Sequence, residues 1–385
     1  MTERTRVHLT RLKLSGFRNY DALDLATDKR HVVLCGENGA GKTNLLEAVS
    51  FLSPGRGMRR ANYDTVGKNG GTGAWSVFAE LEGAAGQVSI GTGIQLGAMG
   101  LETQRRARIN GTQARTADEL SDHARIVWLT PSMDGLFTGP ALERRKFLDR
   151  LVLAMDPAHG RRVADYEKSM RARNRLLSDE NPDRAWLDAI EGQLAAAGVA
   201  IALARIELVS LLSGVIIRTS NPASPFPDAL VRLEGSLEAL ADDTPASDME
   251  GEYAERLRNS RRIDSAAGRT LEGPHRSDLR VMHRPKGMPA EHCSTGEQKA
   301  LLVGMVLAHA RLVADLAGYA PILLLDEIAA HLDSGRRAAL FDIIDALDCQ
   351  AWMTGTDRAL FDAMNERARY FTVSAGSVVE DRIDP

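Results

Sequence analysis

Short apolar runs separated by turn residues fill the first part of the chain. Residues 9–14 alternate apolar and polar side chains, which predicts a half-buried strand, and residues 31–35 form a run that predicts a buried strand. Residues 42–52 carry apolar side chains at helical spacing. An Asn-Gly pair inside residues 108–113 predicts a β-hairpin, so an antiparallel sheet is expected here beside the strand and helix.

From about Leu142 the pattern changes to long stretches with apolar residues at helical spacing and no internal proline. The polar segment 241–248 is expected to be a loose connection, and prolines near residues 221–227 interrupt the helical pattern. The predicted helices are residues 143–155, 161–177, 185–217 and 252–262.

Strand and helix patterns alternate again after Gly268. The predicted elements are helices at 300–316 and 336–347 and buried strands at 322–325 and 351–354. We therefore expect an α/β domain whose two parts, residues 1–138 and 268–385, are separated in sequence by an inserted, mostly helical domain at residues 139–267. Three independent domains would explain this order less well.

Composition narrows the class of protein only a little. The 385 residues carry a net charge of −4, which does not exclude a local basic surface for nucleic acid. The three cysteines, Cys35, Cys293 and Cys349, are far apart and odd in number, so neither a disulfide framework nor a zinc site is predicted. The sequence shows no signal peptide and no long apolar run, so a cytoplasmic location without a membrane is expected.

A complete Walker A pattern follows the strand at 31–35 and opens the helix at 42–52. The pattern predicts that backbone N–H groups surround the β-phosphate of ATP, that Lys42 contacts the β- and γ-phosphates, and that Thr43 is a Mg²⁺ ligand. An ordinary glycine-rich turn is the alternative. The predicted ATP-binding residues are Gly36, Glu37, Asn38, Gly39, Ala40, Gly41, Lys42 and Thr43.

The apolar strand at 322–325 ends in two carboxylates. Asp326 is expected to hold the Mg²⁺ shell beside Thr43, and Glu327 to orient or deprotonate the attacking water. Lys42 and Glu327 are therefore the predicted catalytic residues. Many strands end in an acidic residue, so this pair alone would be weak evidence for an ATPase site. The Walker A pattern in the same chain supports the interpretation.

Ser294-Thr-Gly-Glu-Gln298 precedes the predicted helix at 300–316 and is similar to the ABC signature. A helix N-terminus can present the Ser294 hydroxyl and the Gly296 N–H to a phosphate, which in ABC-type ATPases belongs to the nucleotide of the other subunit. The alternative is a plain capping box closed by Glu297. Both readings stay open, since they use the same free N–H groups.

The sequence contains one further ABC-type feature and lacks two residues that are usual in this class. Asp333 lies in a D-loop-like string, whereas Thr356 stands near the place of the usual histidine and is a candidate for a γ-phosphate contact. No glutamine occurs between Gln113 and Gln193, so residues 127–131 are expected at the Q-loop position without its usual side chain.

Together these motifs resemble the RecF family of ABC/SMC-like ATPases. The resemblance covers about residues 10–379 and is weakest in the helical insertion. The matching strings are Phe17-Arg-Asn-Tyr20, the Walker A segment, Gly55-Arg-Gly57, Gly273-Pro-His-Arg-Ser-Asp278 and residues 324–333. The resemblance implies an ABC-type P-loop ATPase head that dimerises on ATP and binds DNA, with slow hydrolysis resetting the dimer. It also implies that the protein acts at single-strand gaps and adjacent duplex and, together with RecO and RecR type proteins, helps to load RecA.

DNA contacts can be proposed only as basic clusters, which are more often solvated faces. The candidates are Arg56, Arg59, Arg60, Arg105, Arg106, Arg108, Arg144, Arg145, Lys146, Arg171, Arg173 and Arg175. Rival functions are a transporter ATPase subunit, an SMC-like nuclease partner and a non-hydrolysing scaffold. The large insertion, the lack of a further carboxylate cluster and Glu327 argue against these in turn.

Overall fold

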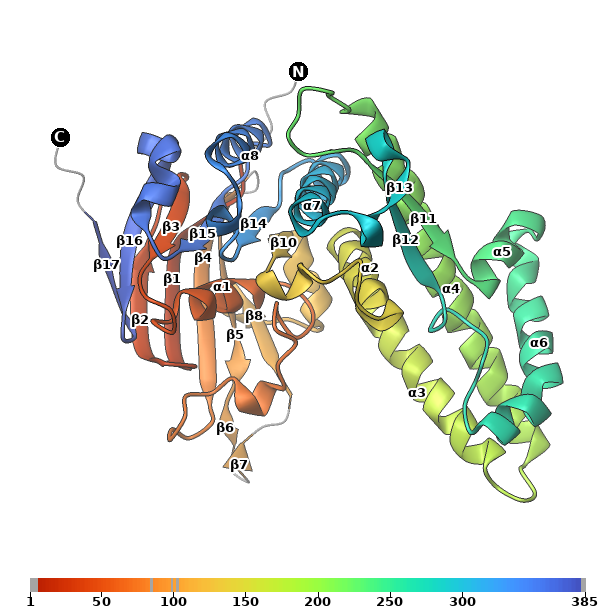
Figure 1. Cartoon of the computed structure of the whole chain (residues 1–385). Helices are drawn as coiled ribbons and strands as arrows, with labels where there is room; N and C mark the ends of the chain where they lie inside the picture. The colour runs from red at the N-terminus through yellow and green to blue at the C-terminus, as the bar shows by residue number, and fades with distance from the viewer. Residues whose placement is uncertain (1–5, 84–85, 98–99, 102–103, 382–385) are drawn as a thin grey trace. The chain divides into compact units, whose positions relative to one another are not determined.

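The computed structural model describes residues 6–83, 86–97, 100–101 and 104–381 (Figure 1). The chain divides into two compact units. The first contains residues 1–134, 219–227 and 294–385, and the second contains 135–218 and 228–293. The expected insertion, 139–267, differs from this division at its C-terminal end. The reason is a strand at 278–283, which pairs inside the second unit rather than with the ATPase head.

A mixed sheet forms the centre of the first unit. Its strands are parallel except for the last one, so several carboxyl ends meet at one edge. In spatial order the strands are β10 (Ile126–Leu129), β14 (Ile322–Leu325), β15 (Ala351–Gly355), β3 (His31–Cys35), β16 (Ala368–Ser374) and β17 (Ser377–Glu380).

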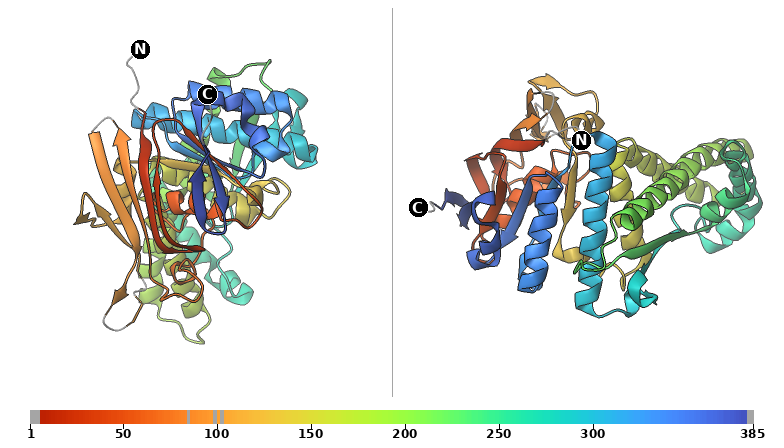
Figure 2. Two further views of the ribbon diagram at one scale, coloured as in Figure 1. Left: turned by 90° about the vertical axis from the view of Figure 1, so that its left-hand side faces the viewer. Right: turned by 90° about the horizontal axis from the view of Figure 1, so that it is seen from above.

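An antiparallel sheet is the second layer of this unit (Figure 2). The predicted hairpin is confirmed, because Ile109 pairs with Thr112 and both Asn110 and Gly111 have positive φ. In spatial order the strands are β2 (Tyr20–Ala26), β1 (His8–Phe17), β4 (Trp75–Gly83), β5 (Gly86–Ile94), β8 (Arg106–Ile109) and β9 (Thr112–Gln113). A small ribbon adds β6 (Leu96–Gly97) and β7 (Gly100–Leu101).

Helix α1 (Lys42–Ser50) packs against both β1 and β15 and thus lies between the two sheets. Helices α7 (Thr295–Ala317) and α8 (Ser334–Ala346) run side by side in both views (Figures 1 and 2). Short 3₁₀ helices complete the unit. They are η1 (Tyr63–Thr65), η2 (Ala117–Asp122), η3 (Pro131–Met133), η6 (Ala329–His331) and η7 (Arg358–Arg367).

The two ends of the chain are joined within the first unit. The side-chain oxygen of Gln350 accepts a hydrogen bond from the Leu9 N–H at 2.9 Å, and its amide nitrogen donates to the Asp28 carbonyl at 2.7 Å. Gln350 is fully buried. A side chain just before β15 therefore fixes the N-terminal strands in place.

The second unit is mostly helical, as the long uninterrupted spacing predicts. Its apolar core lies between α3, α4 and α6 and includes Tyr166, Leu194 and Tyr253. The helices are α2 (Ala141–Met155), α3 (His159–Leu177), α4 (Arg184–Arg218), α5 (Ser236–Asp243) and α6 (Ala246–Ala267). The strands are β11 (Ala229–Glu234), β12 (Asp278–His283) and β13 (Met288–Pro289), with η4 (Arg284–Lys286) and η5 (Ala290–His292) between or after them.

A buried ionic network crosses this core. The Arg173 guanidinium is fully buried and donates to Glu191 at 2.9 Å and to Asp264 at 2.7 Å. It also donates to the Thr270 hydroxyl and to the Leu257 carbonyl. Arg173 therefore serves the packing of the second unit, and its place among the DNA candidates was wrong.

Two described helices, α4 and α7, are long and apolar enough to cross a membrane by length and composition alone. This corrects the expectation that no run approaches that length. Core helices pass the same test, and 67% of the apolar window of α7 is buried in the fold. Helix α4 carries buried Glu191 and Arg205, each in an ion pair, which is typical of a helix packed inside a protein.

Candidate nucleotide-binding site

The glycines of the loop between β3 and α1 are required by close contacts. Gly36 has φ 152°, and a Cβ there would lie 2.2 Å from the Val373 carbonyl oxygen. Gly41 has φ 116°, and its Cβ would lie 2.5 Å from Asn19 Nδ2 and 2.7 Å from the Tyr20 hydroxyl. Only glycine fits at either position without moving the backbone or these side chains.

The tip of the loop is open, whereas Lys42 is held inside it. A Cβ at Gly39 would meet nothing within 4 Å. The Lys42 ammonium is buried and donates to the Gly36 carbonyl at 2.6 Å and the Glu37 carbonyl at 2.8 Å. An ammonium has three hydrogens to donate, so a third remains for a phosphate oxygen. With the free N–H groups of α1, the loop fits a triphosphate.

Asp326 joins the loop to the carboxyl edge of the sheet. Its Oδ1 accepts hydrogen bonds from the Thr43 hydroxyl at 2.9 Å and from the Thr354 hydroxyl at 2.8 Å. Burial raises the pKa of Asp326, and the two hydroxyls oppose that shift. The predicted pair Thr43 and Asp326 is therefore brought together, and both supply the oxygen ligands that Mg²⁺ prefers.

Glu327 has a strained backbone beside this pair. Its φ is 52°, in the left-handed region that a glutamate rarely adopts, and its N–H donates to the Thr354 hydroxyl at 2.8 Å. Thr354 thus bridges the two acidic residues. Thr356, the candidate for a γ-phosphate contact, is exposed two residues further along, and that contact stays a prediction. The predicted strand 351–354 already included Thr354, but its hydrogen bonds to the residues after β14 were not anticipated.

Hydroxyl groups occupy the position where a Q-loop glutamine was sought. Strand β10 ends beside Asp326, whose N–H donates to the Leu129 carbonyl at 2.9 Å. The next residues place the hydroxyls of Thr130 and Ser132 2.8 Å apart. Thr130 is buried, and residues 127–131 therefore do reach the same edge of the sheet.

The predicted signature residues lie at the exposed N-terminus of α7. Glu297 accepts hydrogen bonds from the Ser294 N–H at 3.0 Å and from its hydroxyl at 2.9 Å. The capping box is confirmed. Ser294 and Gly296 are both exposed, so the cap leaves them accessible to a second molecule.

Asp333 caps the next helix close to the signature. Its carboxylate accepts from the Arg336 N–H at 2.9 Å, and the Arg336 Nε lies 3.6 Å from the same carboxylate. A Cβ on Gly296 would lie 3.9 Å from Arg336 Nη1. The D-loop and signature positions are therefore neighbours on one surface of the first unit.

Comparison with known proteins identifies the family. The sequence model described as "RecF/RecN/SMC N terminal domain" matches residues 8–378. The chain is 60% identical over 375 residues to "DNA replication and repair protein RecF" of Rhizobium leguminosarum bv. trifolii strain WSM2304, covering 97% of this chain and 99% of the relative. The chain belongs to the RecF family.

Solved structures show the same fold. One titled "Structure of the recombination mediator protein RecF-ATP in RecFOR pathway" has a TM-score of 0.84 at 22% identity and covers 99% of each chain. An Smc head domain derived from Pyrococcus furiosus, bound to the C-terminal domain of ScpA, has a TM-score of 0.52 at 18% identity, covering 97% of this chain and 96% of that one. The predicted ABC-type ATPase head fold is confirmed.

The Phe17-Arg-Asn-Tyr20 string of this RecF family member forms hydrogen bonds to the backbone of the phosphate loop. Asn19 donates to the Ala40 carbonyl at 3.1 Å, and the Tyr20 hydroxyl donates to the Gly41 carbonyl at 3.1 Å. Asn44 on α1 donates back to Asn19 at 2.7 Å. The turn between β1 and β2 therefore sets the backbone of the loop.

Two arginines hold α1 through one buried glutamate. Glu47 is fully buried and accepts from Arg18 at 2.8 and 2.6 Å and from Arg59 at 3.1 Å. Arg59 also donates to Asn44 at 2.7 Å. Arg59 was a DNA candidate, and these bonds give it an internal role beside the loop.

The Gly-Pro-His-Arg string, the most RecF-like segment, lies inside the second unit. A Cβ on Gly273 would lie 2.1 Å from the Tyr253 hydroxyl and 2.4 Å from that of Tyr166. His275 Nδ1 is 2.7 Å from the Tyr166 hydroxyl, and burial lowers the pKa of His275. The string therefore packs the helical core, a purpose that the sequence alone did not reveal.

The basic clusters are less uniform than their sequence suggests. The Arg105 guanidinium donates to the Phe51, Ser53 and Gly55 carbonyls, with the last at 2.8 Å. Arg144 is buried and donates to Asp278 at 2.7 Å. For these two residues the structure favours packing over a DNA role.

The other candidates are closer to solvent. Arg145 donates to the Ser277 carbonyl at 2.8 Å, and Lys146 pairs with Glu143 at 2.5 Å. Arg56 donates to Asn62 at 3.3 Å, and Arg106 is exposed on β8. Arg60, in the same segment after α1 as Arg56, has a positive φ of 54°. Exposed cations therefore remain on both units.

Proposed function

We propose that this chain is an ATP-dependent DNA-binding recombination mediator that acts as a homodimer. ATP closes the dimer, the dimer binds DNA at single-strand gaps and adjacent duplex, and slow hydrolysis resets it. It would act in the cytoplasm with RecO and RecR type proteins to help load RecA. The main support is the shared Thr43–Asp326–Thr354 cluster beside the phosphate loop, together with the name of the 60% identical relatives.

Each side chain has a role in this proposal. Lys42 and the loop N–H groups would bind the β- and γ-phosphates, and Thr43 and Asp326 would hold Mg²⁺. The metal supplies charge neutralisation at the phosphates when bound. Glu327 would orient or deprotonate the water, and its position next to Asp326 with a φ of 52° supports this role.

The partner protomer would complete each site. Ser294 and Gly296 are exposed at the N-terminus of α7, an end of a helix that favours an anion. For Ser294 to meet a phosphate, its hydroxyl must exchange the bond to Glu297 for one to the ligand. Hydrolysis should thus be slow and should depend on protein concentration, since assembly precedes chemistry.

Solution mass tests the proposal directly. Light scattering would compare wild type, Glu327→Gln and Ser294→Arg, each with and without ATP and Mg²⁺. We expect a doubled mass for wild type and a longer-lived dimer for Glu327→Gln. Ser294→Arg should bind ATP but stay monomeric, because a bulky cation blocks the signature surface. A Glu327→Gln chain that stays monomeric at saturating ATP would refute the dimer mechanism.

A further inference from the structure

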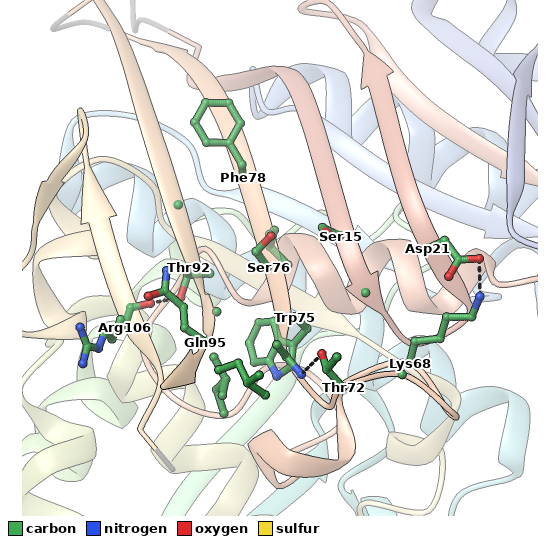
Figure 3. A pocket seen from close by; sticks show the side chains of 18 of the residues that line it. Ser15, Asp21, Lys68, Thr72, Trp75, Ser76, Phe78, Thr92, Gln95 and Arg106 are labelled. Atoms are coloured by element: carbon green, nitrogen blue, oxygen red, sulfur yellow. Dashed lines mark hydrogen bonds and ion pairs between the residues drawn. The ribbon is translucent and has the colours of Figure 1, made fainter. Parts of the chain in front are cut away.

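The solvent face of the antiparallel sheet carries a cavity of about 650 Å³ that the nucleotide site does not use. Its floor is formed by β1, β4, β5 and β8, and Figure 3 shows Phe78, Ser76 and Ser15 on adjacent strands with Arg106 at one side. Gln95 and the exposed Leu96 border it near the small ribbon. An open hollow on a sheet, lined by an aromatic ring and cations, is a candidate ligand surface.

Strand register arranges these side chains in two rows across the sheet. In one row Phe78 pairs with Lys13 on β1 and with Gly91 on β5, and Gly91 pairs with Arg108 on β8. The second row is Ser15, Ser76, Gly93 and Arg106. Each row therefore has small or flat residues in the middle and a cation at the β8 end.

The two glycines keep the floor next to Phe78 low, for different reasons. A Cβ on Gly93 would lie 2.1 Å from the Trp75 carbonyl oxygen, so packing alone requires glycine there. A Cβ on Gly91 would meet only the Phe78 ring, at 3.9 Å, and its φ is not positive. A larger side chain would fit at Gly91, and its absence leaves one side of the Phe78 ring uncovered.

Charge is unequal along this face of the sheet. On the β8 side of Phe78 the hollow is lined by Arg106 and Arg108. Its other side has Asp21 in an ion pair with Lys68, and Lys13 lies 3.5 Å from Asp24. Glu80 and Glu82 line a separate hollow together with Arg11. A polyanion would therefore lie over the β8 side and away from the glutamates. Arg106 and Arg108 are both exposed.

We propose that this face binds unpaired nucleotides of DNA, with one base stacked on Phe78 and the phosphates near Arg106 and Arg108. Sheets with exposed aromatic rings and flanking cations bind single strands in this way, because every base offers a π-face. Bases inside a duplex are already stacked and cannot reach the ring. The inference rests on the proposed function, and it locates the single-stranded side of a gap.

Single substitutions separate stacking from folding. Phe78→Leu keeps the apolar volume but loses the aromatic face, and Phe78→Trp keeps both. Gly91→Val adds a β-branched side chain that suits a strand and covers the floor beside the ring. Arg232→Ala, an exposed arginine on β11 of the second unit, is the matched control for Arg108→Ala.

The experiment measures binding of a labelled oligothymidylate and of a blunt duplex to the full chain with ATP and Mg²⁺. Phe78→Leu and Gly91→Val should weaken oligothymidylate binding roughly 10-fold, and Phe78→Trp should preserve it. Duplex binding should stay within about 2-fold for all three. Arg108→Ala should lower the salt slope of binding by about 1, and Arg232→Ala should not.

Each outcome bears on one claim. If folded, ATP-binding Gly91→Val and Phe78→Leu bind the oligothymidylate like wild type, the surface is wrong while the proposed function stands. If both DNA forms weaken equally, the assignment to unpaired nucleotides is wrong. If wild type binds neither DNA with ATP, the proposed function fails first and this inference fails with it.

Discussion

Two carboxylates in this molecule, the partly buried Asp149 in the second unit and the buried Asp326 in the first, have pKa values shifted in opposite directions. Burial raises the pKa of Asp149, but its bonds to His159 and Arg205 outweigh burial and lower the pKa to about 2. Burial dominates at Asp326, whose partners are two hydroxyls, and its pKa is raised. Asp149 thus has cationic partners within the chain, whereas the proposed Mg²⁺ would supply the cationic partner of Asp326.

The largest expected effect comes from removing the carboxylate charge of Asp149, which forms an ion pair with Arg205. Asp149→Asn leaves the buried Arg205 guanidinium without its carboxylate, although the Pro274 carbonyl still accepts from it at 2.6 Å. We expect a loss of about 3–5 kcal/mol in the free energy of unfolding, measured by urea denaturation. ATP binding should persist at low urea. Wild-type stability in this variant would show that Arg205 finds another partner.

The same Asp-to-Asn substitution at Asp326 should lower ATP hydrolysis rather than stability. Asp326→Asn removes a buried charge but keeps the shape, so the thermal midpoint should stay equal to or above that of wild type. Phosphate release from ATP should fall by roughly 100-fold or more, because Asp326 would help to hold the Mg²⁺ that would neutralise charge on the phosphates. A large drop in stability would mean that Asp326 is held as tightly as Asp149.

Acid unfolding should reveal the sign of each shift. A lowered pKa at Asp149 gives stability that is fully present above the unfolded value of about 3.9 and lost as pH falls toward 2. This contribution is about 2–3 kcal/mol. Asp326 has the opposite sign, since a raised pKa favours the folded state as pH falls. Between about pH 5 and 2, the free energy of unfolding should therefore fall less steeply with decreasing pH in Asp149→Asn and more steeply in Asp326→Asn.

The smallest effect is expected at the hydroxyl that links the two acids. Thr354→Val keeps the side-chain shape, but it leaves the Glu327 N–H without its acceptor. This loss should lower the free energy of unfolding by about 1–3 kcal/mol. Hydrolysis should fall, and Thr354→Ser should restore it. A Val variant that hydrolyses ATP like wild type, with a slower Ser variant, would show that the methyl group, and not the hydroxyl, positions Glu327.

Local chemistry explains what the sequence could predict. The phosphate loop, the acidic strand end and the helix cap at Ser294 each depend on residues within one short segment, and the structure places all three as expected. The link between Thr43 and Asp326 spans 283 positions and was still predictable, because parallel strands end at one edge.

Long-range partners explain what was missed. Strand β11 pairs with β12 about fifty residues later, which moved the boundary of the second unit. The supposedly loose segment 241–248 contains the end of α5 and the start of α6. A basic residue looks the same in sequence whether it bonds to carbonyls, as Arg105 does, or lies exposed, as Arg108 does.

Strand β3, which leads into the phosphate loop, pairs with β15 on one side and β16 on the other. These partners are synthesised more than three hundred residues after it. At roughly 5–20 residues per second, β3 and the nucleotide loop remain without their sheet partners for tens of seconds during synthesis. Nucleotide binding should therefore arise only after the last strands emerge, so a chain truncated before β15 would present the whole Walker A sequence without a site.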